Sequence, residues 1–251
     1  VWTTYKHIGV EDGLSNRRIY NIQKDHQGYM WFLTNEGMDR YNGKDIKHYK
    51  LIEENKQLSS EIHLGWLYAD KEGGIWVIGK KGRIFQYEEK YDRFTMVYKS
   101  PKVTDAISYG YLDRNNNLWL CGKDSILLYN TKTTQVMRLP NLLEDNITVV
   151  EQADDTHFFI ATEMGVRYTQ FENEALKVIP LDMLDHVYTQ INSLYFHPQL
   201  HRLFVGTFSD GTFAYDMSAH QQIKSGIKKQ IRNKNAAIWC ALLLIALPIA
   251  V

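Results

Sequence analysis

Polar side chains that could bind a small polar ligand recur along the chain at intervals close to forty residues. Each stands seven to nine residues before an aspartate-containing turn or its equivalent, just ahead of a strand-like segment. Guanidinium, imidazole, amide and carboxylate groups recognise hydroxyl and carboxylate groups through hydrogen bonds. The predicted chemistry is therefore non-covalent binding of a hydroxyl- or carboxylate-bearing ligand, with a solvated rim as the alternative explanation. The six predicted ligand-binding residues are Asn16, Arg18, His63, Asp105, Asn146 and Gln190, with Arg18, His63 and Asp105 as the main hydrogen-bonding groups.

Motifs that would predict catalysis or metal binding are absent from the sequence. There is no His-Glu-x-x-His segment, no Gly-x-Ser-x-Gly nucleophile elbow, no phosphate-binding glycine loop and no EF-hand run. His197 and His201 are four residues apart, but they flank Pro198 in a predicted hairpin rather than sharing a helix face. The sequence predicts no catalytic residue, no metal and no cofactor.

A five-fold repeat surrounds the predicted binding positions. Five segments share one plan, an aromatic residue, two apolar or small residues, then Thr or Gly, and they recur every 40 to 45 residues. A tyrosine follows each of them nine to eleven residues later. Such a period is typical of one four-stranded propeller blade per repeat, because a blade must stack on neighbours to bury its faces. The aromatic residues are Trp31, Trp76, Trp119, Phe159 and Phe204, and the tyrosines are Tyr41, Tyr87, Tyr129, Tyr168 and Tyr215.

The first repeat predicts its strands most clearly. Alternation of apolar and polar residues predicts a strand over 19–24, and aromatic and β-branched residues predict a second over 29–34. Shorter strands are expected over 38–41 and 46–49, the last two joined at an Asn-Gly turn. No helical periodicity appears before the last thirty residues, so the predicted class is all-β. The turn glycine is missing from the fourth and fifth repeats, which predicts a longer or differently shaped first hairpin there.

Two sets of recurring residues are predicted to be structural. The tryptophans of the second strands and the repeated tyrosines should pack between blades rather than stack on a sugar. The first-turn aspartates, Asp25, Asp70, Asp113 and Asp154, should cap their own turns rather than bind a metal.

Composition restricts the class of protein. Lys+Arg and Asp+Glu both number 29, so the formal net charge is zero and no nucleic-acid partner is predicted. The hydrophobic content of 44% fits a globular chain. Cys121 and Cys240 are too few for a disulfide framework and leave the redox compartment open. The initial Val1 indicates a processed, trimmed or partial chain.

The C-terminal segment differs from the repeats. Residues 1–225 are assigned to the propeller repeats and 226–251 to a basic, then apolar, tail. The apolar part, 236–251, is shorter than the ~20 residues that a membrane-spanning helix needs. A shortened or tilted membrane helix, a fragment artefact and a buried core strand or helix are three open interpretations. The basic residues before it favour a cytoplasmic propeller: Lys228, Lys229, Arg232 and Lys234.

The first repeat resembles the two-component regulator propeller family. The matching residues are Glu11-Asp12-Gly13-Leu14-Ser15-Asn16, Asp25, Gly28, Trp31, Thr34, Gly37 and Arg40-Tyr41-Asn42-Gly43. Later repeats keep fewer of these positions. The resemblance implies a β-propeller that is the extracytoplasmic sensor region of a hybrid histidine kinase, of the type that regulates polysaccharide use. Family sensors usually have seven-bladed propellers, so the five repeats here would be part of a larger one.

The resemblance also implies a function and partners. The chain would bind an oligosaccharide, act as a homodimer on the periplasmic face of a bacterial inner membrane, and be anchored through flanking segments. It would not itself be an enzyme, since the kinase would lie outside these residues. Two alternatives stay open: a propeller-fold lyase or glycoside hydrolase, and a cytoplasmic scaffold for protein interactions. Glycosidases need two positioned carboxylates and no repeat offers an obvious inward pair. The Trp-Asp dipeptide of WD-repeat scaffolds is also absent.

Overall fold

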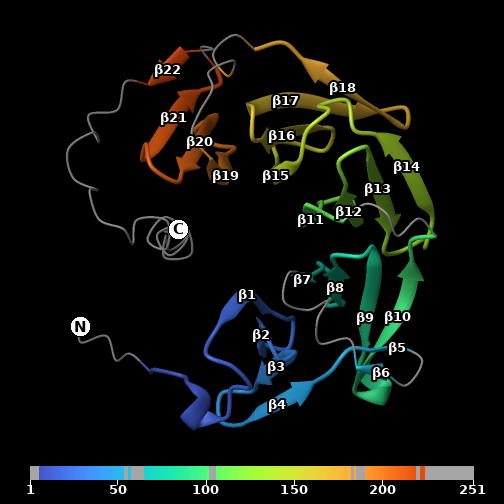
Figure 1. Ribbon diagram of the computed structural model, residues 1–251. Helices are drawn as coiled ribbons and strands as arrows, with labels where there is room; N and C mark the ends of the chain where they lie inside the picture. The colour runs from blue at the N-terminus through green and yellow to red at the C-terminus, as the bar shows by residue number, and fades with distance from the viewer. Residues whose placement is uncertain are drawn as a thin grey trace. The chain divides into compact units, whose positions relative to one another are not determined.

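The structure is a computed structural model that describes residues 6–53, 56–57, 65–101, 106–181, 184, 190–218 and 221–223. Almost all regular structure in these residues is β-strand (Figure 1). Five sheets have four strands each, hydrogen-bonded in the order in which they follow in the chain. We call each of these sheets a blade. The prediction of an all-β chain with about five four-stranded repeats is confirmed.

The strands of the blades have the following bounds. Blade 1 contains β1 (Ile19–Lys24), β2 (Met30–Thr34), β3 (Met38–Tyr41) and β4 (Ile46–Tyr49). Blade 2 contains β7 (Trp66–Ala69), β8 (Ile75–Gly79), β9 (Arg83–Glu88) and β10 (Arg93–Lys99). Blade 3 contains β11 (Tyr109–Leu112), β12 (Asn117–Cys121), β13 (Ser125–Asn130) and β14 (Val136–Pro140). Blade 4 contains β15 (Ile147–Gln152), β16 (His157–Thr162), β17 (Gly165–Glu172) and β18 (Ala175–Ile179). Blade 5 contains β19 (Ile191–His197), β20 (Arg202–Thr207), β21 (Thr212–Asp216) and β22 (Gln221–Ile223).

Three smaller features were not predicted from the sequence. A short hairpin pairs β5 (Ile52–Glu53) with β6 (Lys56–Gln57). Two single-turn 3₁₀ helices are η1 (Val10–Asp12), ahead of blade 1, and η2 (Glu89–Tyr91), between β9 and β10. The bounds predicted for blade 1 agree with the structure, apart from Tyr29, which precedes β2.

The second strand of each blade forms its core. Trp31, Trp76 and Trp119 are at most 2% exposed, and the predicted packing role of these indoles is confirmed. The repeat aromatics also occupy equivalent places: Trp31 is paired with Gln23 of β1, and Phe159 with Glu151 of β15. The repeated tyrosines differ among themselves, because Tyr129 and Tyr215 are buried whereas Tyr41, Tyr87 and Tyr168 are half-buried.

The first-turn aspartates cap their turns, as predicted, and Asp25 and Asp70 also bind a tryptophan. The Asp25 carboxylate accepts the backbone N–H groups of Gln27 and Tyr29 at 3.0 and 2.9 Å, and its other oxygen accepts the Trp31 indole N–H at 2.7 Å. In blade 2 the Asp70 carboxylate accepts the indole N–H of Trp76, also at 2.7 Å. One carboxylate therefore accepts hydrogen bonds both from backbone N–H groups of the turn and from the indole N–H, which is the one polar group of the buried tryptophan side chain.

Asp70→Asn is expected to lower the free energy of unfolding by about 1–3 kcal/mol, because a buried indole N–H loses its charged acceptor. The amide can still accept from the turn, but it presents an N–H group toward the indole in one of its two orientations. Urea unfolding measures the loss. Asp155→Asn, in the equivalent turn of blade 4 and exposed, is the matched control and should change stability by less than about 0.5 kcal/mol. Equal effects of the two variants would contradict this role of Asp70.

The first hairpin changes between blades, as the missing glycines indicated. Gly28 and Gly73 have φ of 90° and 91°, a conformation that glycine adopts without steric cost. In blade 5 His201 takes the left-handed conformation, with φ of 46°. The hairpins of blades 4 and 5 are different in shape and not longer, since only 153–156 and 198–201 separate their strands.

The chain divides into two compact units. The first comprises Val1–Leu112, Asn116–Leu120 and Tyr129–Thr134, and so contains blades 1 and 2. The second comprises Asp113–Asn115, Cys121–Leu128 and Gln135–Val251, with blades 4 and 5, while strands of blade 3 belong to both. The predicted tail, 226–251, lies outside the described residues. Among the residues that are described, no helix is long and apolar enough to cross a membrane.

Candidate functional site

The predicted binding residues that the structure describes, Asn16, Arg18, Asn146 and Gln190, precede the first strand of a blade, and this end of the strand is irregular. In β1 the pairing with β2 shifts between Ile19 and Asn21, and β15 and β19 show the same shift between their first and third residues. A bulge of this kind bends the strand and changes where neighbouring side chains point, and bulges are common beside functional sites. The repeated bulge therefore positions the residues that precede each strand.

A buried threonine closes the loop between the second and third strands at the same end. The Thr34 hydroxyl donates to the Gly37 carbonyl at 3.1 Å and accepts the N–H of Glu36 at 3.1 Å. Thr207 repeats this arrangement with Gly211 and Asp210, at 2.8 and 3.0 Å. The threonine that ends the repeated tetrapeptide thus holds a tight turn next to the candidate site.

In blade 1 the segment before β1 is fastened to a buried carboxylate. Asp39 is 0% exposed, and its Oδ2 accepts the backbone N–H and the hydroxyl of Ser15 at 2.8 and 2.9 Å. Its Oδ1 lies 2.7 Å from Nδ1 of His48. The Ser15 hydroxyl oxygen also lies 2.8 Å from that of Thr34. Asp39 therefore anchors the loop that carries Asn16 and Arg18.

Arg18 is exposed and held in place from two directions. Its backbone N–H donates to Oδ1 of Asn16 at 2.8 Å. Its guanidinium lies 5.2 Å from the centre of the Tyr20 ring, within the range of a cation–π interaction. Tyr20 is fixed in turn, because its hydroxyl donates to Asn35 at 2.6 Å. The structure thus brings Asn16 and Arg18 together, with the guanidinium available to a carboxylate or hydroxyl group.

In the second unit Asn146 and Gln190 precede β15 and β19, and both are exposed. The Gln190 carbonyl accepts the N–H of Phe208 at 2.8 Å, which joins the start of β19 to the loop after β20. The loop that leads to Asn146 is held by Asn141, whose side-chain amide donates to three backbone carbonyls, of Gly122, Lys123 and Asp145, at 2.8–3.1 Å.

The remaining predicted residues, His63 and Asp105, lie outside the described residues. Asn16 and Arg18 belong to one unit, and Asn146 and Gln190 to the other. The convergence of all six on one mouth therefore stays a prediction.

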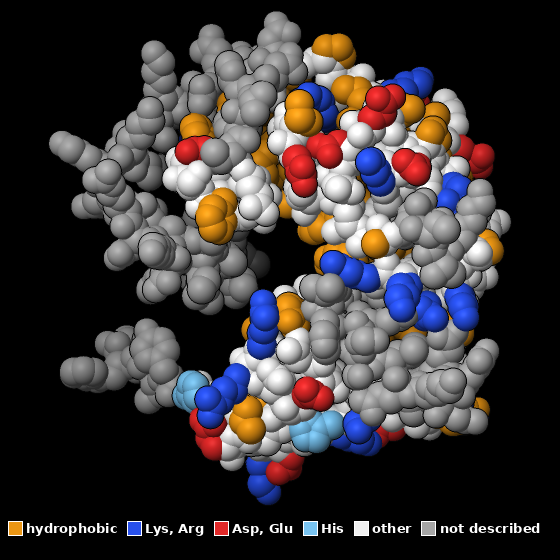
Figure 2. All heavy atoms as spheres, in the orientation of Figure 1, with side chains coloured by type: hydrophobic (Ala, Val, Ile, Leu, Met, Phe, Trp, Pro, Cys, Tyr) orange, Lys and Arg blue, Asp and Glu red, His pale blue; other side chains and the backbone are white. Residues whose placement is uncertain are grey.

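Exposed apolar side chains at this end of the second unit were not predicted from the sequence. Phe208 is 76% exposed in the loop after β20, and Met164 is 60% exposed in the loop after β16. In the sequence, the feature that could have predicted them is their position one or two residues after the threonine that ends each repeated tetrapeptide. On the face drawn in Figure 2 both signs of charge are present, as the zero net charge leads one to expect.

An aromatic cage in the first unit was also not predicted from the sequence. The Arg40 guanidinium lies 4.9–5.7 Å from the ring centres of four aromatic residues and donates to the Tyr87 hydroxyl at 2.6 Å. Next to it, burial opposes ionisation of Asp92, but hydrogen bonds from Lys47, Tyr49 and Tyr87 outweigh it and hold the pKa of Asp92 well below its ordinary value. The cage is occupied by the protein's own cation, Arg40, and joins blades 1 and 2. The four rings belong to Tyr29, Trp31, Tyr49 and Tyr87.

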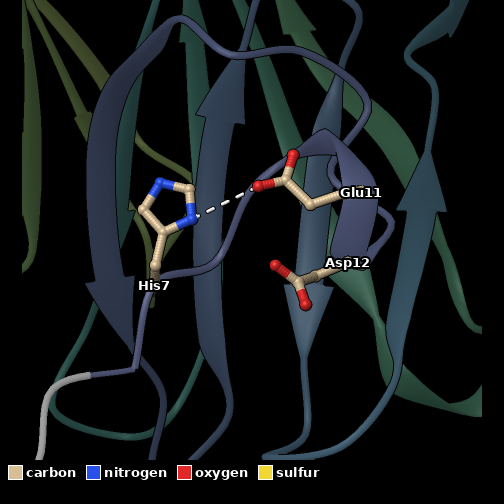
Figure 3. A group of neighbouring side chains, drawn as sticks. All are labelled: His7, Glu11 and Asp12. Carbon is tan, nitrogen blue, oxygen red and sulfur yellow. Dashed lines mark ion pairs between the residues drawn. The ribbon is translucent and has the colours of Figure 1, made fainter.

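One group of exposed side chains could in principle hold a cation. Ligand atoms of His7, Glu11 and Asp12 lie within 4.8 Å of one another, with His7 and Glu11 paired at 3.3 Å (Figure 3). Asp12 is already engaged, because its Oδ2 accepts the N–H of Gly9 at 2.9 Å at the start of η1. Helix capping accounts for the carboxylate, and we assign no metal to this group.

Comparison with known proteins connects the first repeat to a family. Residues 13–36 match the family model described as two component regulator propeller. The match covers the Ser15 anchor and the Arg18 loop. No curated protein matched the chain.

Solved structures show the same fold. The extracellular domain of a candidate hybrid two component system from B. thetaiotaomicron has a TM-score of 0.68 at 19% identity, over 87% of this chain and 31% of that one. The extracellular domain of a candidate one component system from B. thetaiotaomicron has a TM-score of 0.65 at 16% identity, over 86% and 31%. Virginiamycin B lyase from Staphylococcus aureus has a TM-score of 0.63 at 13% identity, over 86% and 73%.

The chain spans about a third of the length of the two B. thetaiotaomicron domains. At these identities the likeness concerns the fold, which is that of a β-propeller built from four-stranded blades. Together with the match over residues 13–36, it confirms the resemblance stated above: the described residues form five four-stranded blades of a β-propeller, the first of which carries a repeat of the two component regulator propeller family.

Proposed function

We propose that the chain is the ligand-sensing propeller of a two-component receptor and that it binds an oligosaccharide at the end of the blades where the first strands begin. The observation that carries the proposal is the family match over residues 13–36, because that segment contains the anchored loop with the exposed Arg18. Loops on a rigid scaffold are the usual place for recognition. Occupancy would be relayed to a histidine kinase outside these residues.

The chemistry of this end suits a sugar ligand. Asn16, Asn146 and Gln190 offer amide groups, which both donate to and accept from hydroxyl groups. Arg18 offers a planar donor array that fits a carboxylate or paired hydroxyls. The exposed Phe208 ring could lie against the apolar face of a sugar ring. Asn16 and Arg18 belong to the first unit, and Asn146, Gln190 and Phe208 to the second.

The proposal includes location and assembly. The chain would lie outside the cytoplasm, anchored to the inner membrane through flanking segments, and would act as a homodimer. Solved propellers of the same fold that are extracellular domains of such systems support this location. A ligand could shift the dimer between two arrangements only by binding one of them more tightly.

Binding can be tested on the purified chain with a glycan array followed by titration calorimetry. For an oligosaccharide that binds, Arg18→Ala should weaken the affinity by roughly tenfold or more, because a charge-assisted hydrogen bond is worth about 1.5–3 kcal/mol. Lys177→Ala, on the fourth strand of blade 4 and exposed, is the control and should leave the affinity unchanged.

The outcomes separate the possibilities. Failure of every oligosaccharide to bind would overturn the proposed ligand class. Binding that is insensitive to Arg18→Ala would support the proposed function and contradict the proposed location of the binding site. Cleavage of a bound glycan would instead support the enzyme alternative, for which the likeness to a lyase supplies a shared fold and no catalytic residue.

A further inference from the structure

Glu151 is a half-buried carboxyl group at the contact between blades 4 and 5. It lies on β15 opposite Phe159 of β16. Its Oε1 accepts the backbone N–H of Phe196, on β19 of the next blade, at 3.0 Å. Both strands belong to the second compact unit and pack against each other. The Phe159 and Phe196 rings lie beside this hydrogen bond, with their centres 5.5 Å apart.

The same position makes a contact between blades elsewhere in the chain. The residue opposite the repeat aromatic is Tyr68 in blade 2 and Tyr195 in blade 5. The Tyr68 hydroxyl donates to the carbonyl of Gly110, on the first strand of the next blade, at 2.5 Å. A phenol at this position is neutral near pH 7, whereas a carboxyl group can gain or lose charge. Blade 4 thus has a titratable group where blade 2 has a neutral one.

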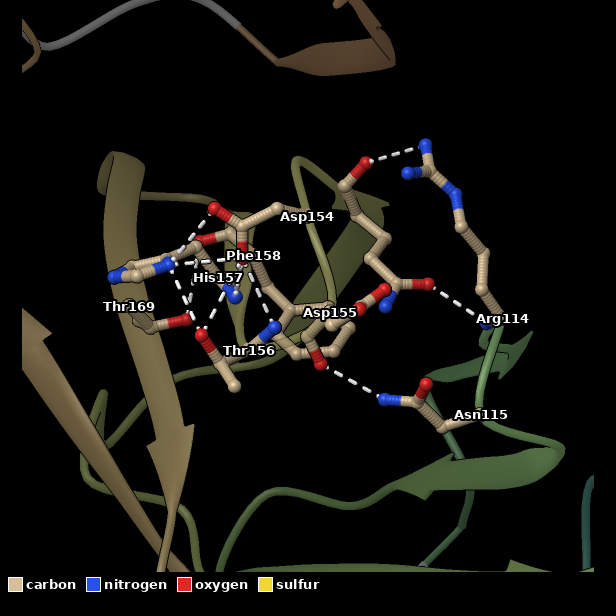
Figure 4. Close-up of polar contacts among 9 residues, drawn as sticks. Arg114, Asn115, Asp154, Asp155, Thr156, His157, Phe158 and Thr169 are labelled. Carbon is tan, nitrogen blue, oxygen red and sulfur yellow. Dashed lines mark hydrogen bonds and ion pairs between the residues drawn. The ribbon is translucent and has the colours of Figure 1, made fainter.

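The charged and titratable groups around Glu151 come from three elements. Arg114, in the turn before β12, donates to the backbone carbonyl of Gln152 at 3.1 Å (Figure 4). His157 of β16 is engaged by Asp154, whose Oδ1 lies 2.9 Å from its Nδ1. Tyr195 and His197 flank Phe196 on β19. Among these groups, Arg114 is the one whose charge acts on the Glu151 carboxyl.

We propose that Glu151 is a proton-dependent latch between blades 4 and 5, which holds β15 against β19 when it is neutral and loosens that contact when it is ionised. Glu151 and Phe196 lie toward the ends of β15 and β19, whereas the predicted ligand residues Asn146 and Gln190 precede the starts of the same two strands.

The direction of the pH effect follows from burial. Burial raises the pKa of Glu151 from 4.5 to about 7, although the Phe196 N–H and the Arg114 charge oppose the rise. Below pH 4.5 the group is protonated in both folded and unfolded chains, so stability does not depend on it. Between pH 4.5 and 7 the folded chain holds a proton that the unfolded chain has released. Stability therefore falls as pH rises through this window and is constant above it.

The test compares the wild type with Glu151→Gln in urea unfolding between pH 4 and 8. Glutamine keeps an oxygen that accepts the Phe196 N–H and cannot ionise. The ratio of the variant's folding equilibrium constant to that of the wild type should grow with pH, by a factor on the order of 10² across the window. Glu172→Gln, exposed at the end of β17, is the matched control and should show no such growth. A ratio for Glu151→Gln that does not change with pH would overturn the proposal.

A second measurement does not depend on the variant. The carbon-13 chemical shift of the Glu151 carboxyl in the wild type should titrate near pH 7, and exchange of the Phe196 amide should accelerate above that pH by more than its intrinsic increase. Titration of Glu151 close to pH 4.5 would overturn the proposal even if Glu151→Gln did not fold. Because neither measurement uses a ligand, failure here would leave the proposed sensing function standing.

Discussion

Arg40→Gln is expected to destabilise the first unit by about 3 kcal/mol, as measured by urea unfolding, because it removes a largely buried cation from four aromatic rings and a charged hydrogen bond. The Arg40 side chain is 19% exposed, so solvent screens its interactions only weakly. Its guanidinium lies 3.7 Å from Asp92, which would lose a neighbouring positive charge. Glutamine fills part of the volume and isolates the effect of the charge.

Two further variants sharpen this prediction. Arg40→Lys keeps the charge but not the planar group that stacks on rings, so it should lose about half as much stability. Arg93→Gln is the matched control, since Arg93 is exposed and lies over the ring of Tyr91 at 5.1 Å. It should cost less than about 0.5 kcal/mol. If the losses from Arg40→Gln and Arg93→Gln were the same, the cage would contribute nothing to the contact between blades 1 and 2.

Asp39→Ala is expected to lower the free energy of unfolding by about 3 kcal/mol or more, because each hydrogen bond to a buried charge is worth about 1.5–3 kcal/mol. Asp39 accepts from the backbone and the hydroxyl of Ser15. Its removal leaves the Ser15 N–H without this acceptor. It also leaves His48 without the carboxylate at 2.7 Å from its Nδ1.

The same variant should act on the candidate site. With its anchor lost, the loop from Ser15 to Arg18 should exchange its amide protons faster than the strands of blade 1. Oligosaccharide affinity should fall with it, even though Asp39 itself is buried and cannot contact a ligand. Asp45→Ala, in the exposed turn before β4, is the control. Unchanged exchange of the Ser15 amide in Asp39→Ala would refute the anchoring role.

Local sequence determined the blades. Strand alternation, the Asp-containing first turn and the Asn-Gly turn act within a few residues, so the four strands of blade 1 were predicted almost to the residue. The burial of Trp31, Trp76 and Trp119 followed from periodicity, because a repeated unit uses equivalent residues to build its core. The Asp25 and Trp31 pair could also have been predicted, since two adjacent strands of one hairpin place residues six apart in reach of each other.

The candidate site could be predicted from the local sequence only in part. Asn16 and Arg18 are two residues apart, and their hydrogen bond is local. Asp39 is 24 residues from Ser15, and nothing in the sequence marks it as the anchor of that loop. The bulges at the start of β1, β15 and β19 were not visible either, because they depend on how each strand pairs with the next.

The sequence by itself determined the number of blades in the described residues, the order of their strands and the family of the first repeat, because all three depend on short, repeated patterns. The tertiary structure alone decided which side chains cross from one blade to the next. Arg40 reaches Tyr87 over 47 positions, and Glu151 reaches Phe196 over 45. From the sequence alone, a carboxyl group on a strand is expected to be solvated, because the residues that surround it in space are not known. Burial against a second blade is what raises its pKa and couples it to pH.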